Sequence, residues 1–188
     1  MPMTANTFHI GLTGHRPPKL GGYDLSTPSY AKLRADLAQY IRFQLSQHSH
    51  VCCHTGMALG ADTIWGLAIL DMKQAFPGRV LLHAETPYLA QANAWFKQSD
   101  RDTWAYLRAN ADFETVYDPE FDTNIVTVGA RHAGNILNAR NHGMVDACDV
   151  MLALYDGTPS GTGNCVTYAQ KQGVPVVMIA PTNYFSKK

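Results

Sequence analysis

The chain has 188 residues, of which 46% are hydrophobic and 16% charged, which is the composition of a globular protein with one core, so we expect a single domain over residues 1–188. Fifteen lysines and arginines balance fifteen aspartates and glutamates, so no net charge draws the protein to the phosphates of a nucleic acid or to an acidic membrane surface. The chain begins without a basic region followed by a long apolar stretch and has no run of about 18 apolar residues, and we therefore expect a cytoplasmic protein with no nucleic-acid or membrane partner.

Strand-like and helix-like segments alternate in the first half of the chain. Residues 7–12 are predicted to form the first strand, which ends in the turn TGHRPP. Thr27 and Pro28 are typical of a helix start, a capping residue followed by proline at the first helical position. Apolar residues then recur at steps of three and four and predict one face of this helix: Tyr30, Leu33, Leu37, Ile41 and Leu45. A second strand over 50–56 follows, and then a helix over 61–76 that ends at a proline-glycine pair.

The second half of the chain continues this alternation. The expected elements are a third strand at 79–85, a helix from Leu89 to Asn110, a fourth strand at 113–118, a helix at 134–149, a buried strand at 150–156, a helix at 164–173 and a last strand at 174–180. Residues 19–27 and 120–134 are expected to form irregular loops. Because such alternation builds crossover units, the sequence predicts an α/β fold with a doubly wound, mostly parallel sheet and helices on both faces.

Glycine-bearing loops follow three of the predicted strands. The carboxyl ends of parallel strands share one edge of a sheet, where ligands bind and helix N-termini present free N–H groups. We therefore expect one ligand site at this edge. Its expected lining is Gly11, Thr13, Gly14, His15 and Arg16 after the first strand, Gly56, Gly60 and Asp62 after the second, and Gly157, Ser160, Gly161, Thr162 and Asn164 after the strand at 150–156.

Glycine suits such a site because, without Cβ, the backbone can adopt positive φ and its amides can approach a phosphate or a sugar. The alternative is that the glycines only shape tight turns, but three such loops at one edge favour a site. Arg16 offers a fork of donors to a phosphate and His15 a hydrogen bond, although Arg16 could equally pair with a surface carboxylate. The chain has neither a dinucleotide fingerprint nor a P-loop lysine, so no cofactor is expected.

The histidines and cysteines raise the question of a metal site. His50, Cys52 and His54 alternate onto one face of the second strand. Tetrahedral sites are usually assembled from turns or from separate elements, so we expect no metal. The chain has four cysteines, which show no spaced framework and are expected to be reduced thiols: Cys52, Cys53, Cys148 and Cys165.

Four segments give nearly the whole chain a resemblance to a known family. They are GLTGHRPPKLGGY, TGMALGADTIWGLAILDMK, PYLAQANAWFKQSDRDTWAYL and NARNHGMVDACDVMLALYDGTPSGTGNCVTYAQKQGVPVV. In this order and spacing they resemble the SLOG superfamily, a Rossmann-like group that includes the LOG and Smf/DprA proteins, and within it the YpsA-like branch. The resemblance implies a Rossmann-like fold with a site for a nucleotide or a nucleotide-derived molecule at the strand ends.

The resemblance also indicates what the chain lacks. Proteins similar to LOG split the bond between base and ribose phosphate with an arginine and with a glutamate shortly after a glycine-threonine pair. Here Gly161 and Thr162 are followed by a glycine and then by Asn164, whose amide cannot supply the negative charge that stabilises a developing oxocarbenium ion. The candidate catalytic residues of an enzyme would be Arg16, Asp62, Arg140 and Asp156. For Asp156 the alternative is a carboxylate that closes a turn.

The missing glutamate favours binding over catalysis. The leading hypothesis is a module that binds a nucleotide-derived small molecule as a sensor or by sequestering it. The alternatives are a phosphoribohydrolase-type N-glycosidic hydrolase and a single-stranded DNA-binding protein of the Smf/DprA kind, which the neutral charge balance disfavours. A homo-oligomer is also expected, because similar proteins form dimers and because Trp95 and Trp104 could pack against a second copy.

Overall fold

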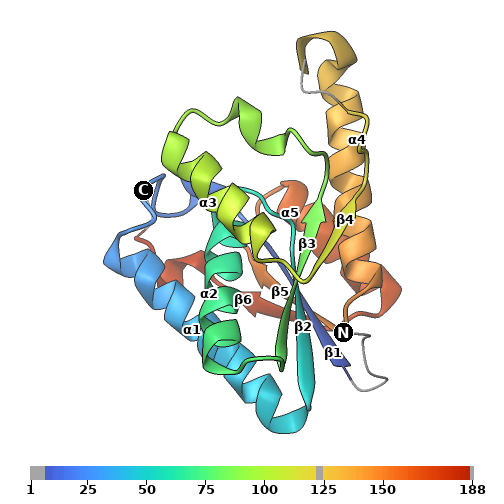
Figure 1. Cartoon of the computed structure of the whole chain (residues 1–188). Coiled ribbons are helices and arrows are strands. Elements are labelled where there is room, and N and C mark those ends of the chain that lie inside the picture. Colours follow the sequence, from blue (N-terminus) through green and yellow to red (C-terminus); the bar gives the residue numbers. More distant parts are fainter. Residues whose placement is uncertain (1–6, 122–124, 187–188) are drawn as a thin grey trace.

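A six-stranded parallel sheet forms the centre of the computed structural model (Figure 1). The structure describes residues 7–121 and 125–186, and only the backbone of residues 125–131. The strands are β1 (Thr7–Gly14), β2 (His50–Thr55), β3 (Val80–Thr86), β4 (Phe113–Val116), β5 (Val150–Leu154) and β6 (Val176–Ile179). Every neighbouring pair is parallel, in the order β4-β3-β2-β1-β5-β6. The Rossmann-like α/β fold expected from the sequence is confirmed.

Helices cover both faces of this sheet (Figure 1). Helices α1 (Pro28–Gln47) and α2 (Ala61–Ala75) pack side by side on one face, and α3 (Gln98–Ala109) lies against α2. Helices α4 (Ile125–Asp146) and α5 (Gly161–Gln172) pack together on the other face. None of the helices in the described ranges is long and apolar enough to cross a membrane.

Apolar periodicity explains why α1 lies where it does. The helix begins at Pro28, directly after Thr27, as predicted. The apolar residues predicted to share one face are all buried: Tyr30, Leu33, Leu37, Ile41 and Leu45. They join a core that contains Ile10 and Leu12 of β1 and Trp65 of α2. Each such side chain contributes about 1.5–3 kcal/mol when it is fully buried.

The strand order creates a switch point beside β1. From β1 the chain adds β2, β3 and β4 in one direction, and then returns to place β5 on the other side of β1. At the end of these two strands Gly14 of β1 is paired with Leu154 of β5. The loops that leave β1 and β5 therefore diverge, and such a crevice outside the carboxyl ends of the strands is where α/β sheets bind ligands.

The prediction of one continuous helix from Leu89 to Asn110 is wrong. The structure has a short 3-10 helix, η2 (Gln91–Ala94), an extended stretch, and then α3. Trp95 and Lys97 have extended ψ angles of 135° and 131°, which no helix accommodates. The guanidinium of Arg101 donates to the carbonyls of Trp95 and Phe96, so the acceptors that the break leaves free are satisfied.

The helix on the opposite face is longer than predicted. α4 begins at Ile125, so the expectation of an irregular loop over 120–134 is wrong from residue 125 onward, while 122–124 lie outside the described residues. Ile136 of α4 is buried against Tyr88 and Phe121. This packing offsets the cost of about 1 kcal/mol that a glycine inside the helix, such as Gly143, carries relative to alanine.

Helix α5 also starts earlier than predicted, at Gly161 instead of at Asn164. Ser160 is its N-cap, because the Ser160 hydroxyl accepts the N–H of Gly163 at 3.2 Å. The helix ends at Gln172 and is capped by Gly173, whose φ of 74° lies in the left-handed region that glycine favours.

Candidate functional site

A hollow of about 350 Å³ opens at the carboxyl edge of the sheet. It is bounded by the turns that follow β1, β2 and β5 and by one side of α4. Its lining residues are Thr13, Gly14, His15, Arg16, Pro18, Lys19, Ala58, Asp62, Leu137, Arg140, Asn141, Ser160, Gly161 and Thr162. The hollow thus lies at the switch point of the sheet.

Positive charge dominates this lining. Arg16, Lys19 and Arg140 are cationic, and Asp62 is the one carboxylate among the described residues that line the hollow. Arg16 is exposed and lies near enough to Asp62 and Arg140 to interact with both electrostatically. Lys19 Nζ donates to the hydroxyl of Thr158 at 2.5 Å. With three cations to one anion, the hollow favours a negatively charged ligand.

A buried ion pair joins α4 to the first turn of α2. Arg140 Nη1 lies 3.2 Å from Asp62 Oδ2, and each side chain is 7% exposed. Asp62 Oδ2 also accepts the N–H of Ala58 at 3.3 Å. Arg140 Nε, in contrast, is buried and has no hydrogen-bond partner among the described residues. Because buried donors are nearly always paired, this N–H is an exception among the polar atoms of the ion pair.

Opposing effects act on the carboxyl group of Asp62. Burial raises the pKa of Asp62, while the nearby guanidinium groups of Arg140 and Arg16 oppose that rise. Its backbone is held in place as well, since the Thr55 hydroxyl donates to the Asp62 carbonyl at 3.0 Å. Asp62 is therefore positioned by α2 and β2, and it in turn positions Arg140.

Two of the glycines expected in the lining make room for groups of the protein itself. A Cβ at Gly56 would lie 1.1 Å from Arg140 Nη1, so only glycine leaves space for this guanidinium. Gly60 has a φ of 100°, and a Cβ there would lie 2.7 Å from the carbonyl oxygen of His15. Met57, between them, has a φ of 58°. The turn between β2 and α2 is shaped to hold Arg140 and the loop after β1.

His15 connects the loops that follow β1 and β5. Its Nε2 lies 2.6 Å from Asp156 Oδ1, and the same oxygen accepts the N–H and the hydroxyl of Thr158 at 2.9 and 2.6 Å. Hydrogen bonds from Thr158 and from His15 lower the pKa of Asp156. Asp156 lines a neighbouring hollow and is 33% exposed. Of the two interpretations of Asp156, this geometry favours the carboxylate that closes a turn.

The start of α5 borders the hollow. The Ser160 hydroxyl and carbonyl accept the N–H groups of Gly163 and Asn164 at 3.2 and 3.0 Å. The N–H groups of Gly161 and Thr162 precede the first intrahelical bond, so they have no acceptor within the helix. Both residues line the hollow, where their N–H groups and the positive end of the helix dipole favour an anion.

The structure brings together most, but not all, of the residues expected at the site. Those that line the hollow are Thr13, Gly14, His15, Arg16, Asp62, Arg140, Ser160, Gly161 and Thr162. Those that lie outside its lining are Gly11, Gly56, Gly60, Asp156, Gly157 and Asn164. Gly11 lies within β1, where a Cβ would approach Met151 Sδ to 2.4 Å, and Asn164 is exposed.

Several lining residues were not expected from the sequence. Leu137 lines the hollow together with Arg140 and Asn141, because positions three and four apart share one side of α4. This helical spacing could have identified Leu137 from the sequence. Pro18 and Lys19 form part of a short 3-10 helix after β1 that no periodicity marks.

A parallel sheet with helices on both faces and a cationic hollow at its switch point defines a Rossmann-like protein of the kind that binds ligands at the strand ends. The chain matches the model of the YpsA family, described as the YspA SLOG family, over residues 10–181. The chain therefore belongs to this family, which confirms the resemblance seen in its sequence.

Individual relatives agree with this assignment. The SPbeta prophage-derived protein YoqJ of Bacillus subtilis (strain 168), itself described as uncharacterized, is 28% identical over 153 residues, which are 78% of this chain and 85% of YoqJ. DNA processing protein A (DprA) of Streptococcus pneumoniae matches 92% of the chain with a TM-score of 0.61 and 15% identity. DprA of Helicobacter pylori matches 95% with a TM-score of 0.56 and 17% identity, over 71% of that protein. The chain spans 50% of the S. pneumoniae protein. At identities this low, the two DprA structures show that the chain shares their fold, and no more.

The ion pair yields a prediction about stability. Asp62→Asn should lower the free energy of unfolding by about 3–5 kcal/mol, because it leaves the buried guanidinium of Arg140 without its countercharge. Urea denaturation measures the change. Asp71→Asn is the matched control: Asp71 pairs with Arg34 at the surface, so its loss should cost no more than about 1 kcal/mol. Equal effects of the two substitutions would contradict a structural role for the buried pair.

Proposed function

We propose that the protein binds a nucleotide or a nucleotide-derived small molecule in the hollow at the carboxyl edge of the sheet, as a sensor or by sequestering it. The observation that carries this proposal is that Arg140 lines the hollow together with two further cations, while its buried Nε has no hydrogen-bond partner among the described residues. A buried donor without an acceptor destabilises the protein by about 1–3 kcal/mol, and a ligand oxygen would remove that cost.

The phosphate would occupy the part of the hollow between α5 and the arginines. The N–H groups of Gly161 and Thr162 supply donors at a helix N-terminus, where the helix dipole stabilises an anion. Arg16 is exposed and has no ion-pair partner among the described residues, so its guanidinium is free to form a bidentate contact. These donors converge on one anionic group instead of tracking a long backbone.

The remainder of the lining suits a sugar and a base. The hydroxyls of Thr13 and Ser160 and the amide of Asn141 can bond ribose hydroxyls, while Leu137 and Pro18 offer apolar surface to a ring. The volume of about 350 Å³ lies near the lower end of the range for small-molecule sites, which favours a mononucleotide-sized ligand.

Hydrolysis of an N-glycosidic bond is the alternative at the same site. Asp62 is the one described carboxylate in the lining, and its carboxylate is engaged by Arg140. Asn164, at the position where LOG-like proteins carry glutamate, is exposed and outside the lining. Both features favour binding without cleavage, and chromatography for released free base would detect cleavage.

Two further expectations remain part of the proposal. The cysteines of the described residues are all free and buried, in keeping with a reducing cytoplasm. Self-association through the segment near Trp95 and Trp104 stays a prediction, and Phe96 is the most exposed aromatic side chain there. Trp104 is half-buried and donates its indole N–H to Gln91 Oε1 at 3.3 Å, whereas Phe96 is 97% exposed. An aromatic side chain so exposed is suited to packing against a second copy.

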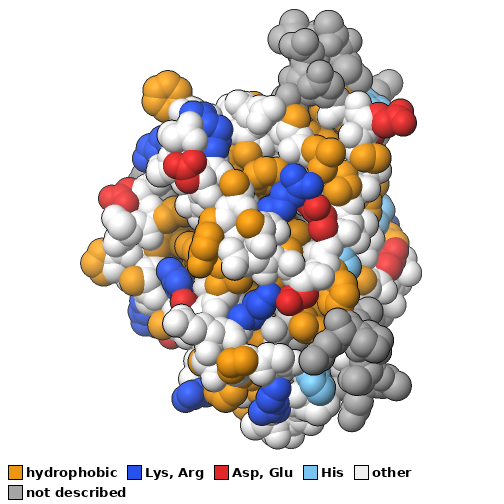
Figure 2. Space-filling model, in the orientation of Figure 1, with side chains coloured by type: hydrophobic (Ala, Val, Ile, Leu, Met, Phe, Trp, Pro, Cys, Tyr) orange, Lys and Arg blue, Asp and Glu red, His pale blue; other side chains and the backbone are white. Residues whose placement is uncertain are grey.

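Single-stranded DNA is a second candidate ligand. The H. pylori neighbour was solved to describe a single-stranded DNA binding mode, and the fold is shared. On the face drawn in Figure 2, however, lysine and arginine side chains lie scattered among acidic and apolar ones. A strand-binding groove combines a continuous basic track with stacking aromatics, and this face does not show such a track.

The nucleotide proposal predicts a specific loss of affinity. Calorimetry with AMP, ADP-ribose, NAD and a cyclic nucleotide should find a ligand that, at a hundredfold excess over its dissociation constant, stabilises the protein by about 2.7 kcal/mol. Arg16→Gln should weaken binding of that ligand at least tenfold, because it removes charge-assisted hydrogen bonds at an exposed position. Arg42→Gln, an exposed arginine of α1 over Phe76, is the control and should bind normally. Stabilisation by none of these compounds would contradict the proposal.

Binding of a nucleotide and binding of single-stranded DNA should depend on salt concentration differently. Fluorescence anisotropy with labelled oligothymidine should show no saturable binding at about 200 mM salt, because the hollow neutralises one phosphate group instead of many. Saturable binding that weakens steeply between about 50 and about 200 mM salt, and that Arg16→Gln reduces, would support DNA over the nucleotide.

A further inference from the structure

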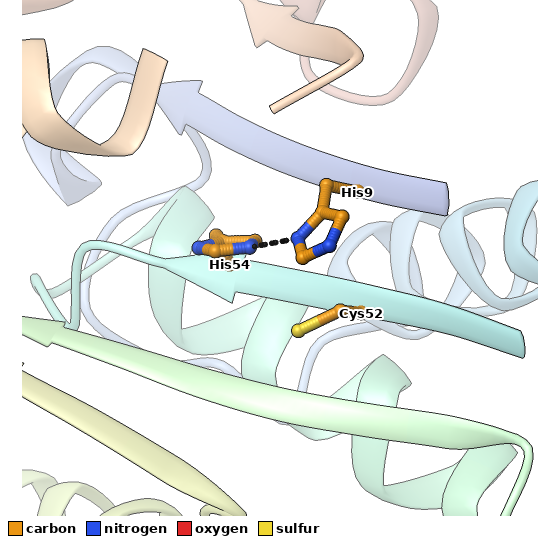
Figure 3. Close-up of side chains that lie close together, drawn as sticks. All are labelled: His9, Cys52 and His54. Atoms are coloured by element: carbon orange, nitrogen blue, oxygen red, sulfur yellow. Dashed lines mark hydrogen bonds between the residues drawn. The ribbon is translucent and has the colours of Figure 1, made fainter. Parts of the chain in front are cut away.

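Three potential metal ligands meet on the face of the sheet that α4 and α5 cover. Parallel pairing places His9 of β1 opposite Cys52 of β2, and His54 lies two residues further along the same strand. Residues two apart on a strand share a face, so all three side chains point to the same side of the sheet (Figure 3). Cys52 and His54 are 0% and 1% exposed, whereas His9 is half-buried, which gives solvent a route to the group.

The two imidazole nitrogens are spaced nearly as they are in a tetrahedral centre, and the thiol lies nearby. His9 Nδ1 and His54 Nε2 lie 2.9 Å apart, and one ligand atom from each of the three residues lies within 4.8 Å of the others. Two Zn–N bonds of about 2.0–2.1 Å at the tetrahedral angle hold their nitrogens roughly 3.3 Å apart. The imidazoles would have to separate by only a few tenths of an ångström to admit an ion between them.

A carboxylate behind His54 fixes the orientation of its ring. His54 Nδ1 lies 2.7 Å from Glu85 Oε1, and the hydroxyl of Tyr117 donates to Glu85 Oε2 at 2.9 Å. A Cβ at Gly143 of α4 would lie 2.1 Å from the Tyr117 hydroxyl, so that glycine leaves the tyrosine room. With its Nδ1–H donated to Glu85, His54 presents the lone pair of Nε2 toward His9. This is the carboxylate–histidine–metal arrangement that orients ligands in metal sites.

We infer that His9, Cys52 and His54 form a Zn²⁺ site, with Glu85 as the residue that orients His54. Two imidazole nitrogens and a thiolate suit a borderline-soft ion, whereas Mg²⁺ and Ca²⁺ require oxygen ligands. The Cys52 thiol gives up its proton to solvent on binding. The two charges of the ion are then balanced by the thiolate and by the Glu85 carboxylate, so the buried site carries no net charge.

A second group shares His54 but competes poorly. His54, His83 and Glu85 also have ligand atoms within 4.8 Å of one another. An ion there would replace the hydrogen bond between His54 and Glu85, and His83 Nε2 already lies 2.8 Å from the Thr115 hydroxyl. This group also lacks a thiolate. The site with Cys52 keeps the His54–Glu85 bond intact and replaces the hydrogen bond between His9 Nδ1 and His54 Nε2 instead.

The fold supplies the ligand that the sequence pattern did not. His50, Cys52 and His54 alternate on one strand, but the Nδ1 of His50 lies 3.0 Å from the Ser49 hydroxyl and His50 belongs to neither group. His9 takes its place from the neighbouring strand. The objection that such sites are drawn from separate elements therefore no longer applies. None of these residues lines the hollow, so this inference stands or falls independently of the nucleotide proposal.

Metal binding can be measured on the full chain after removal of metal with EDTA. Titration with Zn²⁺ should show one saturable site per chain and a rise in melting temperature. Substitution with Co²⁺ should give the visible bands of tetrahedral Co²⁺ and a thiolate-to-metal charge-transfer band. Cys52→Ser and His9→Gln should each weaken Zn²⁺ binding at least tenfold, and Cys52→Ser should abolish the charge-transfer band.

Cys53→Ser is the matched control, because Cys53 is equally buried on the opposite face of the same strand. It should retain Zn²⁺ binding and the charge-transfer band. Should Cys52→Ser fail to fold, His9→Gln alone decides, since His9 is half-buried. The inference is overturned if the protein shows no saturable Zn²⁺ site. It is equally overturned if His83→Gln abolishes binding while His9→Gln and Cys52→Ser leave it unchanged, which would assign the ion to the competing group.

Discussion

The buried ion pair between Arg140 and Asp62 is the interaction on which the rest of the hollow depends. Arg140 comes from α4, which covers one face of the sheet, and Asp62 from the first turn of α2, which covers the other, so the pair ties the two helical layers together across the carboxyl edge. Two charges of this kind are costly to bury, and they are tolerated where their hydrogen bonds are nearly complete. The Nε of Arg140 is the exception, and it belongs to a residue that lines the hollow.

Other features of the edge follow from the need to accommodate this pair. Gly56 is required because any side chain there would displace the guanidinium, and Gly60 lets the loop after β1 approach α2. The Ala61 N–H donates to the carbonyl of His15 at 3.3 Å, and the His15 ring lies 2.6 Å from Asp156. Hydrogen bonds within the chain thus connect the loops that follow β1, β2 and β5. The hollow is shaped in advance, which reduces the entropic cost of ordering loops around a ligand.

Much of this could be predicted from the sequence, because it depends on local patterns. The alternation of elements and the apolar face of α1 predicted the fold, and the glycine loops predicted the edge where Thr13, Asp62 and Thr162 meet. The rest depends on contacts between distant segments. The register that places His9 beside Cys52, and the contact of Gly56 with Arg140, leave no mark in a linear pattern. A helix that is stabilised mainly by tertiary packing, as α4 is, also shows only a weak periodic signal.

We propose that Arg140 and the start of α5 bind one anionic group together. The most direct measurement is a titration of the ¹⁵N-labelled protein with inorganic pyrophosphate, followed by NMR of the arginine Nε–H and backbone N–H resonances. We expect the Nε–H resonance of Arg140 and the N–H resonances of Gly161 and Thr162 to shift together along one saturation curve. Shifts confined to other surfaces, or an Arg140 Nε–H that does not respond at saturation, would contradict it.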